Sequence, residues 1–113
     1  MRTLQQPLFT PETEWVPPNR LPDLSSYSDI AIDLETRDPN LLTLGSGAVR
    51  RDGEIVGIAV AVEGWSGYFP IAHEGGGNMD RAIVLDWFEE VLNNTSTKIF
   101  HNAMYDVSWI RSL

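Results

Sequence analysis

The chain has 113 residues, of which 42% are hydrophobic and 21% are charged, and this composition indicates one globular domain rather than a fibrous or wholly disordered protein. No apolar run approaches the ~20 residues of a transmembrane helix, and the N-terminal residues lack the apolar core of a secretory signal. The absence of cysteine excludes disulfides, thiolate metal sites and cysteine nucleophiles, so the cytoplasm is the expected compartment.

The charge balance restricts how the chain could contact nucleic acid. Eight Lys and Arg residues against sixteen Asp and Glu residues give a net charge of -8. A domain that binds nucleic acid by neutralising phosphates alone carries the opposite sign. Contact with nucleic acid would therefore need bridging divalent cations or a basic partner domain.

The first 28 residues differ in composition from the rest of the chain. Five of the seven prolines lie within the first 22 residues. Each proline lacks a backbone donor and restricts the residue before it to extended conformations. Residues 1–28 are therefore predicted to form an irregular, extended arm, with Trp15 and Leu21 packing on the body, and residues 29–113 are predicted to form the folded domain.

The first half of the body shows strand patterns. Ile30, Ile32 and Leu34 alternate with polar residues and alanine, which predicts a strand with one apolar face. The residues 36–54 that follow are rich in Gly and are predicted to form a long loop that ends in a turn at 51–54. Three strands are expected to form an antiparallel meander: residues 29–35, 55–62 and 66–72.

The second half alternates helix and strand patterns. Apolar residues recur at helical spacing over 81–92, and Asn78 or Asp80 is expected to cap that helix. Residues 97–102 predict a short strand that pairs in parallel with an earlier one, because a helix precedes it. Residues 103–113 begin a second helix and stop within its pattern, as expected for a truncated chain, a proteolytic fragment or the N-terminal part of a longer chain. The fold class is thus α/β with a mixed sheet.

Three carboxylates are candidates for one site. Asp33 and Glu35 are two residues apart on a strand, so both side chains project from the same face and their repulsion requires a proton or a cation. Asp106 lies in the first turn of the final helix. If the strand at 97–102 lies beside the first strand, all three carboxylates meet at one opening of the sheet. Each acidic element alone is also typical of a solvated surface, so the hypothesis depends on their convergence.

A cluster of carboxylate oxygens favours one class of metal. Hard oxygen ligands suit Mg²⁺ or Mn²⁺ rather than zinc. Two such ions can activate a water molecule and stabilise the leaving oxygen of a phosphodiester. They would also bridge an acidic domain to a phosphate, which is what the net charge of -8 requires.

Two segments resemble known motifs. Residues 30–41, IAIDLETRDPNL, resemble the first motif of the DEDD 3′-5′ exonucleases, and residues 101–110, HNAMYDVSWI, resemble the second. Residues 48–62 between them are similar to the second and third strands of that domain in family A DNA polymerases, especially phage-type enzymes. The resemblance implies a ribonuclease H-like mixed sheet, two Mg²⁺ or Mn²⁺ ions, and proofreading hydrolysis at a single-stranded or frayed 3′ end of DNA.

The resemblance also implies roles for individual residues. Asp33 corresponds to the carboxylate that bridges both metals, Glu35 to a ligand of the tighter metal that also contacts the terminal 3′-hydroxyl, and Asp106 to the ligand of the second metal. Four further residues would contact the substrate strand, with a leucine as wedge on the terminal base: Thr36, Leu41 (or Leu42), Asn102 and Tyr105.

The resemblance is incomplete in one respect. The family uses a fourth carboxylate, in a third motif with a Tyr or His before the Asp, and that motif lies beyond the second. We therefore expect the remainder of the polymerase chain as a partner, little or no nuclease activity from these residues alone, and self-association through an uncovered sheet edge. Two other interpretations stay open: a stand-alone DEDD exonuclease acting on RNA or DNA, and an inactive exonuclease fold that serves as a nucleic-acid-binding scaffold.

Overall fold

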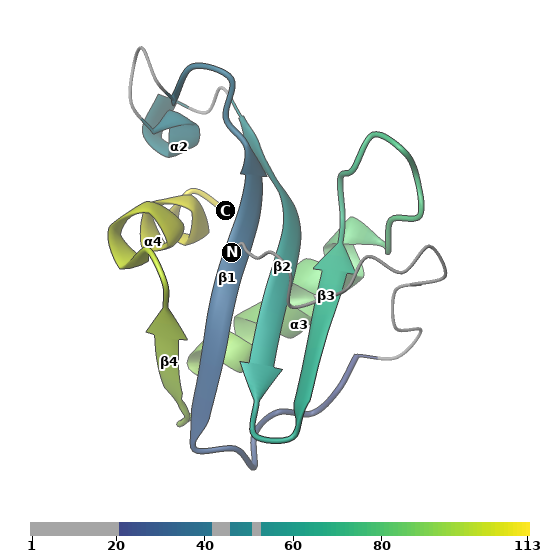
Figure 1. Ribbon diagram of the computed structural model, residues 1–113, viewed down its shortest axis with the longest axis vertical. Coiled ribbons are helices and arrows are strands. Elements are labelled where there is room, and N and C mark those ends of the chain that lie inside the picture. Colours follow the sequence, from purple (N-terminus) through teal and green to yellow (C-terminus); the bar gives the residue numbers. More distant parts are fainter. Residues whose placement is uncertain (1–20, 42–45, 51–52) are drawn as a thin grey trace.

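A computed structural model describes residues 21–41, 46–50 and 53–113. Four strands form one mixed sheet in the order β3-β2-β1-β4 (Figure 1). This arrangement confirms the predicted α/β class and is compatible with a ribonuclease H-like fold. The elements in chain order are β1 (Asp29–Arg37), α2 (Gly47–Arg50), β2 (Glu54–Val62), β3 (Trp65–Pro70), α3 (Arg81–Asn93), β4 (Thr97–Phe100) and α4 (Ala103–Arg111).

The sheet pairs as the sequence predicts. β1, β2 and β3 form an antiparallel meander, and β4 lies parallel to β1. β4 is short, and its last residue, Phe100, pairs with Ile32. β1 continues beyond this point to Arg37. Asp33 is therefore the first residue of β1 beyond the pairing with β4.

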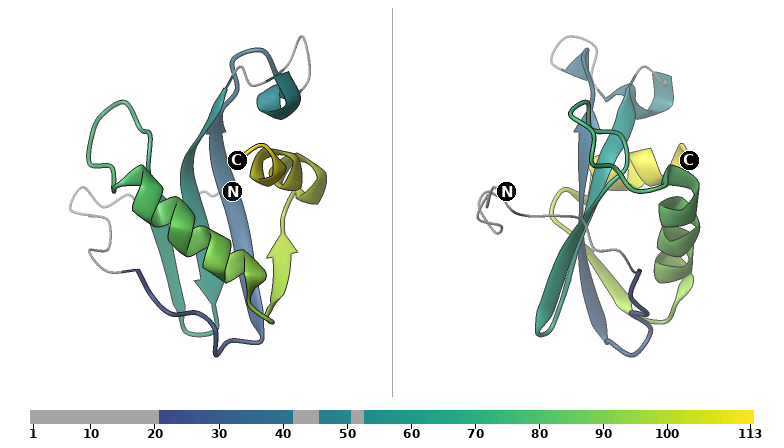
Figure 2. Two further views of the ribbon diagram at one scale, coloured as in Figure 1. Left: turned by 180° about the vertical axis from the view of Figure 1, so that it is seen from behind. Right: turned by 90° about the vertical axis from the view of Figure 1, so that its right-hand side faces the viewer.

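Helix α3 covers one face of the sheet (Figure 2). Ile30, Ile32 and Leu34 of β1 point to that face and are buried. The N-cap of α3 is Asp80, as predicted. Its side chain accepts a hydrogen bond from the backbone N–H of Ile83 at 3.1 Å. This bond satisfies one of the unpaired donors of the first turn. The helix buries four residues against the sheet: Val84, Trp87, Phe88 and Val91.

The described end of the N-terminal arm packs on the domain. Leu24 is buried in the core. Leu21 packs against the core, which confirms its predicted contact with the body. The indole Nε1 of Trp87 donates a hydrogen bond to the carbonyl oxygen of Pro22 at 2.7 Å. Residues 21–28 form no helix or strand. Trp15, the other residue predicted to fix the arm, lies outside the described residues.

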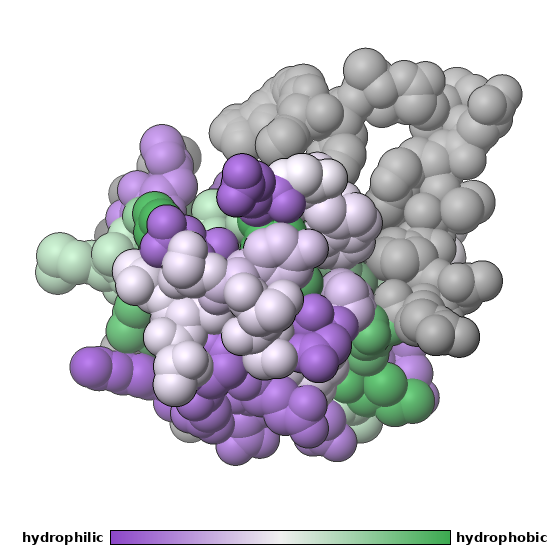
Figure 3. Space-filling view, turned by 90° about the horizontal axis from the view of Figure 1, so that it is seen from below, coloured by the Kyte–Doolittle hydropathy of each residue, from purple (hydrophilic) through white to green (hydrophobic). Residues whose placement is uncertain are grey.

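The surface near the β2–β3 turn is mostly polar or weakly polar, and its apolar residues form separate patches (Figure 3). β3 and β4 are the edges of the described sheet. Ile99 on β4 keeps 51% of its surface exposed, so this edge carries some of the uncovered apolar area that the sequence predicts. Within the described ranges, no helix has the length and apolar character needed to cross a bilayer.

Several predicted boundaries are wrong. β1 extends to Arg37 instead of ending at residue 35, and β3 ends at Pro70 instead of at residue 72. The loop predicted over 36–54 contains the short helix α2, whose first N–H groups are bound by side chains: Gly47 donates to Asp38 Oδ2 at 3.0 Å and Ala48 to Ser46 Oγ at 3.2 Å. A helix of one turn has no measurable periodicity, so the pattern could not reveal it. β4 ends at Phe100 rather than at residue 102, because the chain turns into α4 there. Residues 51 and 52 of the predicted turn lie outside the described part.

Replacing Phe88 with Ala tests the packing of α3. The Phe88 side chain is 1% exposed, so we expect the free energy of unfolding to fall by roughly 3 to 5 kcal/mol. Ile83 on the same helix is 59% exposed, and Ile83→Ala should cost about 0.5 kcal/mol or less. Urea denaturation monitored by circular dichroism measures both values. Equal effects of the two substitutions would contradict this packing.

Candidate functional site

Asp33 and Asp106 approach each other where β4 ends. The chain leaves β4, passes Asn102 and enters α4, where the Asp106 N–H donates to the Asn102 carbonyl oxygen at 2.9 Å. This first helical turn carries Asp106 back towards β1 and within electrostatic range of Asp33. The structure thus brings together two of the three predicted acidic ligands, although more than 70 residues of sequence separate them.

The Asp106 carboxyl group is in an unusual environment. Among the described residues it is the one charged side chain that is buried, with 2% of its surface exposed. Burial is the larger cause and the charge of Asp33 the second cause of a raised pKa for Asp106, which reaches about 6. His101 and a backbone hydrogen bond of Asn102 lower this pKa by smaller amounts. Its Oδ2 atom has no hydrogen-bond partner in the part of the chain that the structure describes. A buried oxygen without a donor is costly, and a proton or a cation at this position would relieve that cost.

Glu35 lies on the same strand but its carboxylate is directed elsewhere. The Tyr68 hydroxyl donates a hydrogen bond to Glu35 Oε1, and His73 Nε2 lies 3.5 Å from the same oxygen. In the part of the chain that the structure describes, no three Asp, Glu or His side chains are grouped closely enough to hold a metal ion. The structure therefore contains an Asp33–Asp106 pair with Glu35 beside it, not the predicted group of three.

Gly57 explains how Tyr68 reaches Glu35. Gly57 pairs with Glu35 in the β1–β2 register, and Tyr68 lies on β3, on the other side of β2. A Cβ atom on Gly57 would overlap with the hydroxyl and ring of Tyr68. Only a glycine at this position lets the Tyr68 side chain cross β2 to the Glu35 carboxylate.

A second hydrogen-bonded group fixes the start of α4. The Tyr105 hydroxyl donates to Asp38 Oδ2 at 2.9 Å and lies 2.7 Å from Thr36 Oγ1, which then acts as the donor to Tyr105. Burial raises the pKa of Tyr105, so its hydroxyl keeps the proton that it donates. Two of the predicted substrate-binding residues, Thr36 and Tyr105, are thus hydrogen-bonded to each other. They hold the first turn of α4, which carries Asp106, against the end of β1.

The other predicted substrate contacts lie at the surface. Asn102 is exposed at the N-cap of α4, where its side chain makes no capping hydrogen bond. Leu41 is 41% exposed, and its N–H donates to the Asp38 carbonyl oxygen at 3.2 Å. Both positions leave the side chain accessible to a ligand. Leu42, the alternative wedge, lies outside the described residues.

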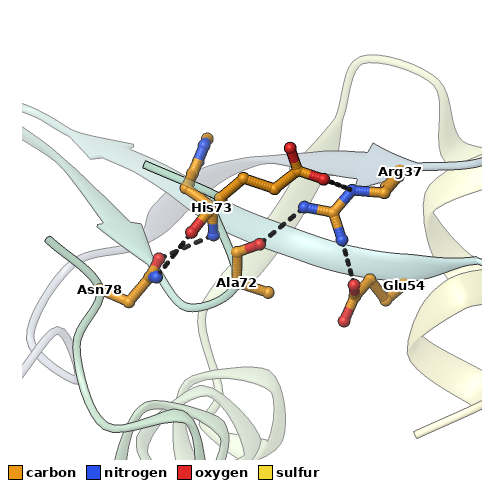
Figure 4. Close-up of polar contacts among 6 residues, drawn as sticks. Arg37, Glu54, Ala72, His73 and Asn78 are labelled. Carbon is orange, nitrogen blue, oxygen red and sulfur yellow. Dashed lines mark hydrogen bonds and ion pairs between the residues drawn. The ribbon is translucent and has the colours of Figure 1, made fainter. Parts of the chain in front are cut away.

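The loop that carries His73 is held by polar contacts (Figure 4). Arg37 forms an ion pair with Glu54 and donates to the carbonyl oxygen of Ala72 at 2.8 Å. The Asn78 side chain binds both backbone groups of His73: its Oδ1 accepts from the N–H at 2.8 Å, and its Nδ2 donates to the carbonyl oxygen at 2.9 Å. These contacts fix the backbone from which the His73 ring reaches Tyr68.

Three residues of this region were not among the predicted site residues: Asp38, Tyr68 and His73. A glycine inside an otherwise apolar strand was the available signal for Tyr68, because it indicates a close approach of another group. Asp38 follows Glu35 by three residues and precedes Pro39, and no local pattern distinguishes it from a turn residue. His73 has no sequence signal beyond its position after a strand.

Replacing Asp106 with Asn should stabilise the protein at neutral pH when divalent cations are removed with a chelator. The pKa of Asp106 is raised from 3.8 to about 6 in the folded protein, so wild-type stability falls as the pH rises from about 4 to about 6. Asn cannot ionise, so above that range we expect a gain of up to about 3 kcal/mol, and none at pH 4. Urea denaturation at both pH values measures the difference.

The matched control for this prediction is Asp86→Asn, which removes an exposed carboxylate on α3. We expect it to leave the pH dependence of stability as it is in the wild type. An Asp106→Asn protein that is less stable than the wild type at neutral pH would contradict the unfavourable burial of this charge.

Comparison with known proteins identifies a related segment. The sequence is 42% identical over 116 residues to a DNA-directed DNA polymerase of Pseudomonas phage M6, and the match covers 97% of this chain and 18% of the polymerase. The chain thus spans less than a fifth of the length of that relative. No protein-family model matches the sequence, and no solved structure matches it. The predicted resemblance to a phage DNA polymerase is confirmed, and the exonuclease assignment stays a prediction: this chain is similar to one segment of a phage DNA polymerase.

Proposed function

We propose that this chain is the N-terminal part of the 3′-5′ exonuclease domain of a phage-type DNA polymerase. The observation that carries the proposal is the buried Asp106 carboxylate, unpartnered at Oδ2, beside Asp33 at the end of β4. The reaction is hydrolysis of the terminal phosphodiester at a mispaired or single-stranded 3′ end, with release of a nucleoside 5′-monophosphate. The similarity to a phage polymerase supports proofreading as its setting.

The residues present fit a divalent cation. Asp33 and Asp106 offer carboxylate oxygens, the ligands that Mg²⁺ and Mn²⁺ prefer, and the unpartnered Oδ2 of Asp106 is a vacant acceptor in a buried position. When bound, such ions polarise the phosphate and activate the attacking water. Glu35 projects from the same face of β1 as Asp33, and its exposed side chain can rotate to provide a third ligand.

The neighbouring residues divide into two roles in this proposal. Tyr105 acts as a positioning residue, because its hydroxyl is engaged by Asp38 and Thr36 and fixes the turn that carries Asp106. The exposed side chains of Asn102 and Leu41 contact the substrate strand. The Tyr105 ring, rather than its hydroxyl, is then the surface offered to a nucleotide.

The negative charge of the chain sets how DNA is held. With a net charge of -8, these residues repel a phosphate backbone unless cations intervene. We assign that function to the bound metals at the terminal phosphodiester and to the remainder of the polymerase chain along the strand. That remainder would also contribute the fourth carboxylate, since these residues contain three of the four that the family uses.

Two observations separate this proposal from its alternatives. Similarity to a polymerase, rather than to a stand-alone nuclease, favours proofreading over RNA processing. An inactive scaffold would gain stability by replacing Asp106 with a neutral residue, because its buried charge is unfavourable without a cation. The retained Asp33 and Asp106 therefore favour an ion-binding function over a scaffold.

Calorimetric titration with Mn²⁺ tests the proposed site. We expect the wild-type chain to bind Mn²⁺ and both Asp33→Asn and Asp106→Asn to lower the affinity at least tenfold, because each removes one anionic ligand. Asp86→Asn, on the exposed surface of α3, should bind as the wild type does. Mn²⁺ binding that survives in both site variants would show that the ion binds elsewhere.

The second test is nuclease activity of the 113-residue chain on single-stranded DNA with Mn²⁺. We expect turnover at least about 100-fold below that of a complete proofreading domain, because loss of one ligand of a two-metal centre costs orders of magnitude in rate. Release of nucleoside monophosphates from a 3′-labelled oligonucleotide measures it. Full activity of this chain would contradict the need for a fourth carboxylate outside it.

A further inference from the structure

We propose that Tyr68 and His73 are positioning residues that hold the Glu35 carboxylate on the β2–β3 side of the sheet, so that Glu35 must leave them to join a cation at Asp33 and Asp106. The inference rests on the proposed function, because it assumes that the Asp33–Asp106 pair binds a divalent cation. It concerns residues outside the two sequence motifs, on β3 and in the loop that follows it.

The strand order supplies the first argument. Asp106 approaches β1 from the β4 side of the sheet, whereas Tyr68 lies on β3, across β2 from β1. The hydrogen bond from the Tyr68 hydroxyl to Glu35 Oε1 therefore draws the carboxylate away from Asp106. In agreement with this direction, Asp106 interacts electrostatically with Asp33 and His101, and no group of three ligands exists among the described residues.

The contacts of Tyr68 hold its hydroxyl in position as the hydrogen-bond donor to Glu35. Its side chain lies across Gly57, and its ring meets the His73 ring edge-on, with 5.7 Å between the ring centroids. The Tyr68 hydroxyl donates its proton in a hydrogen bond to Glu35 Oε1. Because that proton is donated to Glu35, the Tyr68 oxygen is the acceptor for His73 Nε2–H. The three side chains form one directed series, from His73 through Tyr68 to Glu35.

The backbone contacts of His73 explain why this series is stable in place. Arg37 binds the Ala72 carbonyl oxygen and Asn78 binds both backbone groups of His73, so the loop cannot carry the ring away without breaking several hydrogen bonds (Figure 4). Glu35 itself is exposed, with 56% of its side-chain surface open to solvent, and is the part free to move. A bound cation and the Tyr68–His73 pair therefore compete for one carboxylate.

Removing the Tyr68 hydroxyl should strengthen cation binding. In Tyr68→Phe, Glu35 loses a charge-assisted hydrogen bond that it must otherwise give up to reach the metal. We expect the Mn²⁺ affinity of the 113-residue chain, measured by calorimetry, to rise about threefold to tenfold. Tyr27→Phe removes a hydroxyl next to the opposite end of β1 and should leave the affinity unchanged. An affinity of Tyr68→Phe equal to or lower than that of the wild type would overturn the inference.

A spectroscopic measurement separates this inference from the proposed function. Tyrosine labelled with ¹³C at Cζ reports the hydroxyl environment of Tyr68 by NMR, and Glu35→Ala in the absence of metal gives the signal of the released state. We expect saturating Mg²⁺ to move the wild-type Tyr68 signal towards that position. If Mg²⁺ binds, and Asp106→Asn abolishes that binding, while the Tyr68 signal stays unchanged, the inference fails and the proposed function stands. If neither wild type nor Tyr68→Phe binds a divalent cation, both fail.

Discussion

The burial of the Asp106 carboxylate beside Asp33 is the interaction on which the rest of this site depends. Its position follows from a short strand: β4 ends opposite Ile32, and the chain turns at once into α4. Desolvation and a second negative charge make the ionised form of Asp106 unfavourable, and no group among the described residues forms a hydrogen bond with its Oδ2 atom. Two contacts of α4 nevertheless hold Asp106 in this position. Trp109, on the same helix, is buried in the core, and the Tyr105 hydroxyl donates a hydrogen bond to Asp38.

The two sides of the site differ in how their carboxylates are held. On the α4 side, Asp106 is enclosed, and its helix is held by apolar packing and by the Tyr105 hydrogen bonds. On the β3 side, Glu35 is exposed, and its carboxylate makes polar contacts with Tyr68 and His73. A polar contact at the surface exchanges with water at small net cost, whereas a buried one does not. In the proposed cation site, Asp33 and Asp106 would stay in place, and Glu35 would join them only when a cation is bound.

An acidic domain that acts on DNA must attract phosphate through something other than its own side chains. In the proposed function, the carboxylates on β1 and α4 would bind small divalent cations, and those cations would provide the positive charge that a phosphodiester requires. In the proposed function, contacts along the DNA strand would come from other parts of a polymerase like the phage enzyme of which this chain spans 18%. The metal site and the strand-binding surface need not reside in the same residues.

The sequence by itself determined the four strands, the helices α3 and α4, and the shared face of β1 that carries Asp33 and Glu35. Periods of two and 3.6 residues are local properties, so β1, β2, α3 and their apolar faces could be read directly, and Asp33 and Glu35 share a face because they are two residues apart. Only the tertiary structure decided that Asp106 is buried within electrostatic range of Asp33, because that arrangement depends on where β4 ends. Tertiary structure alone also directed Glu35 to Tyr68, across the missing side chain of Gly57. No periodicity encodes the direction of one long side chain across a neighbouring strand, and the single turn of α2 is too short to have one.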